Sequence, residues 1–139
     1  MTWLARAAML TAAMLGPGAA VAGALAQCEG AARDFDAVAR CLTALDLETL
    51  TALQQAERRA GAAAREFDER SKRGNTGYAA LAQASRAFAL YQGAQCDYAH
   101  AMTPGANVRP TMAGPTAADL ARIACRIDLA RQRIDELGN

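Results

Sequence analysis

The stretch LARIACRIDLARQRIDEL, residues 120–137, has the most regular hydrophobic pattern in the sequence. Its apolar residues recur in alternating steps of three and four, at Leu120, Ile123, Ile127, Ala130, Ile134 and Leu137. That spacing places them on one face of an amphipathic α-helix. Thr116 is the expected N-cap, Asp119 completes an acidic variant of the capping box, and Gly138 is placed to end the helix.

Upstream of this helix the pattern predicts two further main helices and one short one. A helix is expected from Asp46, which can cap it, to about Arg73, where residues 74–77 (GNTG) stop it. The next runs from about Tyr78 to Ala101. Its expected face is partly aromatic and contains Tyr78, Leu81, Ser85, Phe88, Tyr91 and Gln95. A short helix is expected over residues 31–41, before the first main helix.

The segment Thr103–Pro115 contains three of the four prolines and two glycines, so it predicts a long loop. Long loops on a rigid scaffold are common sites of function. Asn107 and Arg109 are its polar side chains, flanked by Met102, Val108 and Met112. We therefore take Asn107 and Arg109 as the candidate partner-binding residues.

Composition agrees with an all-α domain. Of the 139 residues 37 are alanine and only 5% are aromatic, which favours helices over a β-sandwich or barrel. The formal net charge of +1 provides no basic field of the kind that nucleic-acid binding requires.

Residues 1–26 have the pattern of a signal peptide. Arg6 is followed by an uncharged stretch that ends in the small-x-small triplet Ala24-Leu25-Ala26, so we expect cleavage after Ala26. A retained membrane anchor is the alternative, but residues 16–18 (GPG) interrupt the apolar stretch, and no stable membrane insertion is expected after cleavage. Residues 25–28 come close to a lipoprotein box, although the box needs a small residue where Gln27 stands.

All four cysteines lie in residues 27–139, which we expect to form a single domain. Four cysteines in a small exported domain predict two disulfides, with three possible pairings. Pairing of sequence neighbours is favoured, namely Cys28–Cys41 and Cys96–Cys125. The absence of a Cys-x-x-Cys spacing and the presence of only one histidine argue against a metal site or a redox centre, and no cofactor is expected. The expected fold is therefore a small disulfide-stapled bundle of three main helices plus a short N-terminal helix.

Two stretches resemble the LprI-type lysozyme-inhibitor domain family. In residues 81–96 (LAQASRAFALYQGAQC) Leu81 matches the family's leucine, Phe88 stands at its tryptophan, Tyr91 at its aromatic position and Cys96 at its cysteine. In residues 124–137 the matching residues are Cys125, Arg133 and Leu137. The chain departs from the pattern at Ser85, Gln92, Gly93 and Ala130.

Several of these residues also have a purely structural interpretation. At helical spacing Phe88 and Tyr91 are expected in the core rather than in a recognition patch, and His100 is expected to be an ordinary helix-end residue. The acidic residues of 128–136 lie beside Arg131 and Arg133, which is typical of a solvated, salt-linked face. For Arg133 both a buried ion pair and a surface contact remain open.

The resemblance implies an exported protein that occludes the sugar cleft of a lysozyme or a related muramidase. Strongly basic lysozymes would be steered by negative charge. Removal of Arg6 leaves 14 basic and 14 acidic residues, yet the segment from Glu29 to Glu48 has five acidic and two basic ones. The alternative is a general periplasmic protein-interaction or stress module with no enzyme target. The sequence shows no nucleophile paired with a base, no metal cluster and no phosphate-binding loop, so nothing in it suggests an enzyme.

Overall fold

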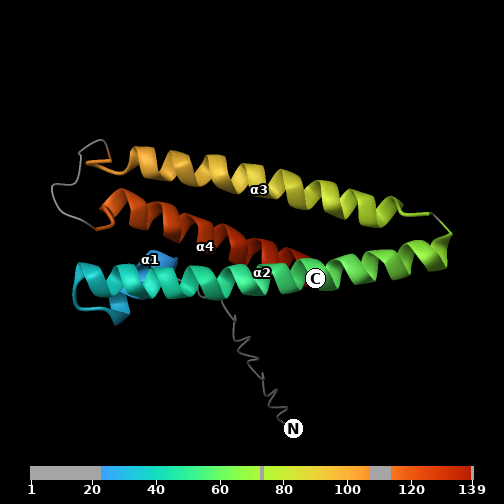
Figure 1. The fold of residues 1–139 in the computed structure, drawn as a ribbon, viewed down its shortest axis with the longest axis horizontal. Helices are drawn as coiled ribbons and strands as arrows, with labels where there is room; N and C mark the ends of the chain where they lie inside the picture. The colour runs from blue at the N-terminus through green and yellow to red at the C-terminus, as the bar shows by residue number, and fades with distance from the viewer. Residues whose placement is uncertain (1–22, 73, 107–113, 139) are drawn as a thin grey trace, which may run out of the picture.

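The computed structural model describes residues 23–72, 74–106 and 114–138, and within these ranges the chain is helical with no strand. The elements are a short α1 (Ala24–Ala31) and the long helices α2 (Phe35–Ser71), α3 (Thr76–Met102) and α4 (Ala117–Gly138) (Figure 1). The expected class is confirmed: an all-α fold of three main helices plus a short N-terminal one.

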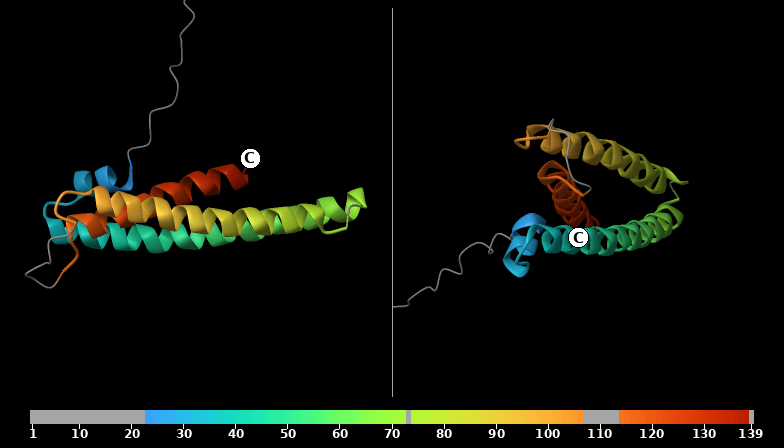
Figure 2. Two further views of the ribbon diagram at one scale, coloured as in Figure 1. Left: turned by 90° about the horizontal axis from the view of Figure 1, so that it is seen from above. Right: turned by 60° about the vertical axis from the view of Figure 1, so that its left-hand side comes forward.

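The three main helices are arranged around a long hairpin. α2 and α3 run antiparallel, and α4 packs in the angle between them, antiparallel to α3 (Figures 1 and 2). α4 has 22 residues against 37 in α2, so it ends before the α2–α3 turn is reached. α1 lies against α2 and α4 at the opposite end. We call this opposite end, where α1, the start of α2, the end of α3 and the start of α4 meet, the loop end.

The main core lies near the loop end because α1, α2 and α4 all contribute to it there. Leu42 of α2 and Ile127 of α4 are completely buried and are among its largest side chains. The α4 pattern is confirmed: Leu120, Ile127 and Ala130 are buried, and Ile123 packs against the core. Among the described residues, no helix is both long and apolar enough to cross a membrane.

The sequence-based boundaries of the first helices are wrong. The expected helices over 31–41 and from Asp46 onward are one continuous helix, and the short N-terminal helix lies earlier, at residues 24–31. The N-cap of α2 is Asp34, whose carboxylate accepts a hydrogen bond of 2.7 Å from the backbone N–H of Ala37. Asp46 does not begin a helix, and its carboxylate forms an ion pair with Arg126 of α4.

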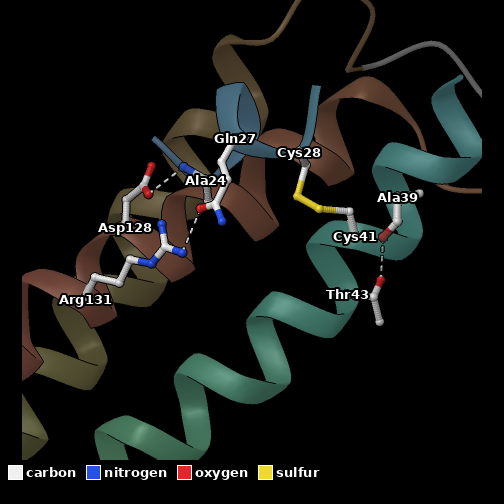
Figure 3. Close-up of a disulfide and its surroundings, with 8 residues drawn as sticks. All are labelled: Ala24, Gln27, Cys28, Ala39, Cys41, Thr43, Asp128 and Arg131. Carbon is white, nitrogen blue, oxygen red and sulfur yellow. Dashed lines mark hydrogen bonds between the residues drawn. A yellow bond between two sulfur atoms is a disulfide. The ribbon is translucent and has the colours of Figure 1, made fainter. Parts of the chain in front are cut away.

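Both disulfides pair sequence neighbours, as expected. Cys28–Cys41 joins α1 to α2 across a Cα–Cα distance of 5.7 Å, and Cys96–Cys125 joins α3 to α4 across 5.5 Å (Figure 3 shows the first). The Cys28 thiol is therefore used in a disulfide and is not available to carry a lipid. In the chain-entropy model, closing loops of this size contributes about 3–4 kcal/mol each.

The expected end of α2, at about Arg73 before residues 74–77, is slightly too late. α2 finishes at Ser71, and Lys72 and Gly74 adopt left-handed backbone conformations with φ of 54° and 65°. α3 has already begun at Thr76, so the second half of that tetrapeptide is helical. The left-handed residues reverse the chain within a few positions, which brings α3 back along α2.

Candidate functional site

The candidate loop between α3 and α4 is described only at its two ends. Asn107 and Arg109 lie outside the described residues, so their contribution to a binding surface stays a prediction. On the α3 side the chain turns at once: the N–H of Ala106 donates to the carbonyl of Thr103 over 3.1 Å, and Gly105 has a φ of 82°. On the α4 side the chain re-enters the bundle at Thr116.

The second end of the loop is fixed by the expected capping box. One oxygen of the Asp119 carboxylate accepts hydrogen bonds of 2.8 Å from both the backbone N–H and the hydroxyl of Thr116. The Thr116 hydroxyl oxygen in turn accepts from the Asp119 N–H over 3.1 Å. His100 of α3 lies 3.5 Å from the other carboxylate oxygen, so this helix-end histidine links α3 to the start of α4.

These contacts set the electrostatics of Asp119. The backbone hydrogen bond from Thr116, followed by that from its hydroxyl, lowers the pKa of the Asp119 carboxyl. Partial desolvation opposes the shift, while His100 and Arg122 lower the pKa further. A carboxylate that is hydrogen-bonded in its charged form is held ionised, so the start of α4 stays capped at neutral pH.

An apolar groove lies beside the α4 end of the loop. Leu47 and Leu50 of α2 are 68% and 49% exposed, and together with Pro115 they line an open groove of about 680 Å³. Large apolar side chains that stay this exposed on a helix, gathered in one place, are typical of a binding surface. The hydrophobic pattern did not reveal this groove, because Leu47 and Leu50 directly follow the expected helix start at Asp46 with the three-residue spacing that is typical of a buried helix face.

Acidic side chains are gathered at the same end. Glu29 of α1, the N-cap residue Asp34, and Asp36 and Glu48 of α2 are all exposed. The segment that contains them lies at or near the loop end of the bundle (Figure 1). The described ends of the loop, the apolar groove and the acidic segment, which are separated in the sequence, therefore lie at the same end of the bundle.

The residues that match the two family motifs lie elsewhere, on α3 and α4. Leu81, Phe88, Arg133 and Leu137 are partly buried. Tyr91 is 55% exposed, so its expected place in the core is wrong. The inward face of α3 continues from Phe88 to Gln92 and Cys96 rather than to Tyr91 and Gln95, because steps of four bring Cys96 to its disulfide with α4.

Arg133 is largely buried and forms an ion pair, which is the first of the two alternatives that the sequence leaves open. Its side chain is only 14% exposed, and its guanidinium forms a 3.3 Å ion pair with Glu136 one helical turn on. The guanidinium carbon also lies 5.8 Å from the centre of the Phe88 ring. This distance is within the range of a cation–π contact, which links α4 to α3.

One important polar residue was missed altogether. Asp68, which lies in a run of charged residues near the end of α2, is only 2% exposed. Its carboxylate accepts hydrogen bonds of 2.9 Å from the backbone N–H groups of Gly77 and Tyr78. It caps α3 in place of Asn75, whose side chain makes no capping bond. The available clue was Gly77, which directly precedes the expected helix start at Tyr78.

The fold and the site together define a small, disulfide-stapled helical domain with an exposed apolar groove at one end. No group of three or more His, Cys, Asp or Glu side chains in the described part of the chain is placed to hold a metal ion. A family model described as Lysozyme inhibitor LprI matches residues 28–137, and the chain belongs to this family. The match spans all three main helices and all four cysteines, and the expected resemblance is confirmed.

Other comparisons add no relatives. No curated protein and no solved structure matches the chain. The family is one of inhibitors rather than enzymes, and two disulfides are typical of proteins that fold outside the cytoplasm.

Proposed function

We propose that the protein is exported to the periplasm or beyond and inhibits a lysozyme-like muramidase by covering its sugar cleft with the loop end of the bundle. Membership in the lysozyme-inhibitor family supports the class of partner. The two disulfides support folding in an oxidising compartment.

The observation that carries the proposal is that the loop end combines three features of a recognition surface. The Leu47–Leu50–Pro115 groove offers apolar contact, exposed carboxylates of α1 and the start of α2 lie at the same end of the bundle, and the groove includes Pro115 at the α4 end of the long loop. An apolar centre with a polar rim is the usual anatomy of a protein–protein interface. The hairpin tip, which α4 does not reach, lacks the loop and the acidic segment.

Charge at the loop end favours a basic partner. The segment from Glu29 to Glu48 has a net charge of −3, although one of its carboxylates, that of Asp46, is paired with Arg126 of α4 and the chain as a whole is close to neutral. A local field of this kind accelerates association with a cationic enzyme and is screened by salt. The association rate should therefore fall as ionic strength rises, while the apolar groove sustains part of the affinity.

Inhibition by occlusion needs no chemistry from the inhibitor. A loop that enters the cleft excludes the polysaccharide, and polar groups on it meet the enzyme's catalytic carboxylates. Asn107 and Arg109 are the side chains proposed for this role. The cation of Arg109 suits a carboxylate, because an arginine fork donates two parallel hydrogen bonds to it.

A bacterial-cell lysis assay tests the proposal. Oxidised protein is titrated against several lysozyme types, alongside the variants Leu47→Ser/Leu50→Ser and Asn107→Ala/Arg109→Ala. We expect dose-dependent inhibition that weakens about tenfold or more in each variant. Leu90→Ser is the matched control, because Leu90 is 79% exposed on α3 and should not matter.

Two results would contradict the proposal. Absence of inhibition of every lysozyme type at tens of micromolar protein would remove the enzyme target. Inhibition that is lost with Leu90→Ser but kept in both loop-end variants would move the binding surface to α3.

A protein-interaction module without an enzyme target is the second candidate, and one observation favours it. Tyr91, Tyr98 and Met102 are each more than half exposed and recur at helical spacing on the outer side of α3. A stripe of exposed aromatic residues suits a protein partner. The variant Tyr91→Ser/Tyr98→Ser separates the candidates, since it should leave lysozyme inhibition intact.

A further inference from the structure

The N-terminal end of α1 is bound tightly to α4. Ala24 is completely buried, and its backbone N–H donates a 2.8 Å hydrogen bond to the Asp128 carboxylate (Figure 3). One turn later, Gln27 accepts a 2.9 Å hydrogen bond from the guanidinium of Arg131. α1 is thus held to α4 by two polar contacts in addition to its disulfide with α2.

Gly23 is part of the same arrangement. Its carbonyl accepts the first backbone hydrogen bond of α1, from Gln27 over 3.0 Å. It approaches Asp128 so closely that an added β-carbon would lie 3.0 Å from a carboxylate oxygen. Gly23 has no side chain to cap α1, and Asp128 supplies the cap from across the interface.

Cleavage after Ala26 would remove this arrangement. It would take Ala24 and Leu25 out of the core and leave the Asp128 carboxylate without the N–H that it binds. α1 would keep residues 27–31 only, which is little more than one turn and too short to be a stable helix. Residues 23–26 therefore behave as part of the folded domain.

We propose that signal peptidase cuts between Ala22 and Gly23 and that the new α-ammonium group of Gly23 forms an ion pair with Asp128. Ala20-Val21-Ala22 is a second small-x-small triplet, directly before Gly23. Hydrolysis adds one water across the peptide bond, so Ala22 leaves with a carboxylate and Gly23 begins the mature chain with an amine that takes up a proton. The inference rests on the export part of the proposed function, not on lysozyme binding.

The ion pair follows from the position of Gly23. Its amino nitrogen is bonded to the α-carbon that already lies against the Asp128 carboxylate. A free ammonium next to a helix N-terminus is unfavourable, because the helix dipole places positive charge there. One carboxylate at that point compensates both charges, which gives Asp128 a role that begins only after processing.

Intact mass and N-terminal sequencing of the protein test the cleavage site. The full chain, with its own leader, is expressed in a Gram-negative host and purified from the periplasm. We expect a chain that begins at Gly23 and contains both disulfides. A chain that begins at Gln27, shorter by the residues 23–26, would overturn the inference, and so would a chain that keeps its leader.

Leader variants provide a matched pair. Ala22→Arg should block processing at the proposed bond, while Ala26→Arg should be processed normally, since Ala26 is exposed and no longer adjoins a cut. The reverse pattern would establish the later site. Neither result depends on whether any lysozyme is inhibited, so failure of this inference and failure of the proposed function are distinguishable.

The ion pair has a separate readout in the purified mature protein. Asp128→Asn keeps an oxygen that can accept from Ala24 but removes the negative charge. We expect a lower denaturant midpoint than in the wild type and a smaller difference in high salt. An unchanged midpoint at low salt would overturn the pairing.

Discussion

Asp68 shows how one buried carboxylate joins two helices. It belongs to α2, but its two oxygens accept the backbone N–H groups of Gly77 and Tyr78 at the start of α3. The approach leaves no room for a side chain at position 77, where a β-carbon would lie 2.9 Å from one carboxylate oxygen. The hairpin turn therefore depends on Asp68 and Gly77 together.

Gly77→Ala tests this dependence. We expect the substitution to destabilise the protein by about 1–3 kcal/mol, because the methyl group displaces the Asp68 carboxylate. Gly93→Ala is the control in the same helix, where nothing lies within 4 Å of the added carbon. That change should stabilise by about 0.5–1 kcal/mol through helix propensity. Denaturant unfolding measures both, and equal effects at the two positions would contradict the role of Asp68.

The contact of Arg133 with the Phe88 ring is the second test at the scale of residues. A double-mutant cycle with Phe88→Leu and Arg133→Met should give a coupling energy of about 0.5–1 kcal/mol, since the guanidinium is largely shielded from water. Additive effects of the two substitutions on the free energy of unfolding would show that packing alone holds the pair.

At the scale of elements, the capping box of α4 makes stability depend on pH. The pKa of Asp119 lies below its ordinary value of 3.8 in the folded protein. A lowered folded pKa means that the stabilisation is complete above the unfolded pKa and is lost as pH falls through the folded one. Asp119→Asn should therefore cost about 1 kcal/mol near neutral pH, and the difference from the wild type should shrink below about pH 4.

Unfolding curves at several pH values check this expectation. Asp97→Asn is the control, because the Asp97 side chain is 68% exposed and only pairs with Arg122 over 3.2 Å. Its effect should be small at every pH. A difference for Asp119→Asn that grows on acidification would contradict the lowered pKa of Asp119.

Element boundaries were predictable where local patterns decide them and not where distant contacts do. α4 has both a regular apolar stripe and a complete capping box, and both are found as expected. Asp46 looks like a helix start, yet its partner is Arg126, 80 residues further along the chain. Residues 42–45, which separate the expected short helix from Asp46, include no helix breaker, so α2 continues through them.

The inward face of α3 illustrates the same limit. Up to Phe88 the expected face is partly buried, but the aromatic side chain of Tyr91 led the prediction one position away from the true continuation. The disulfide to α4 fixes Cys96 inward, and Gln92 lies one turn before it with its amide donating to the Arg126 carbonyl over 2.9 Å. Only the tertiary structure reveals that choice.

For the whole molecule, the fold class and the disulfide pairing followed from composition and spacing, but the groove of the candidate site did not. At the described ends of the loop, residues 103–106 and 114–116, the chain is non-helical, as its prolines and glycines predict. That Leu47 and Leu50 stay exposed beside Pro115 depends on how α2 and α4 pack, which local sequence does not encode. The loop end therefore became a candidate surface only when these segments were seen together.

Hydrogen–deuterium exchange with and without a saturating lysozyme tests the central claim most directly, because it maps the binding surface on the intact protein. We predict slower exchange on binding over residues 24–50 and 103–119, at the loop end. Residues 57–85, at the hairpin tip, should exchange at unchanged rates and serve as the internal control. Slower exchange confined to the hairpin tip, or no change with any lysozyme, would contradict the account.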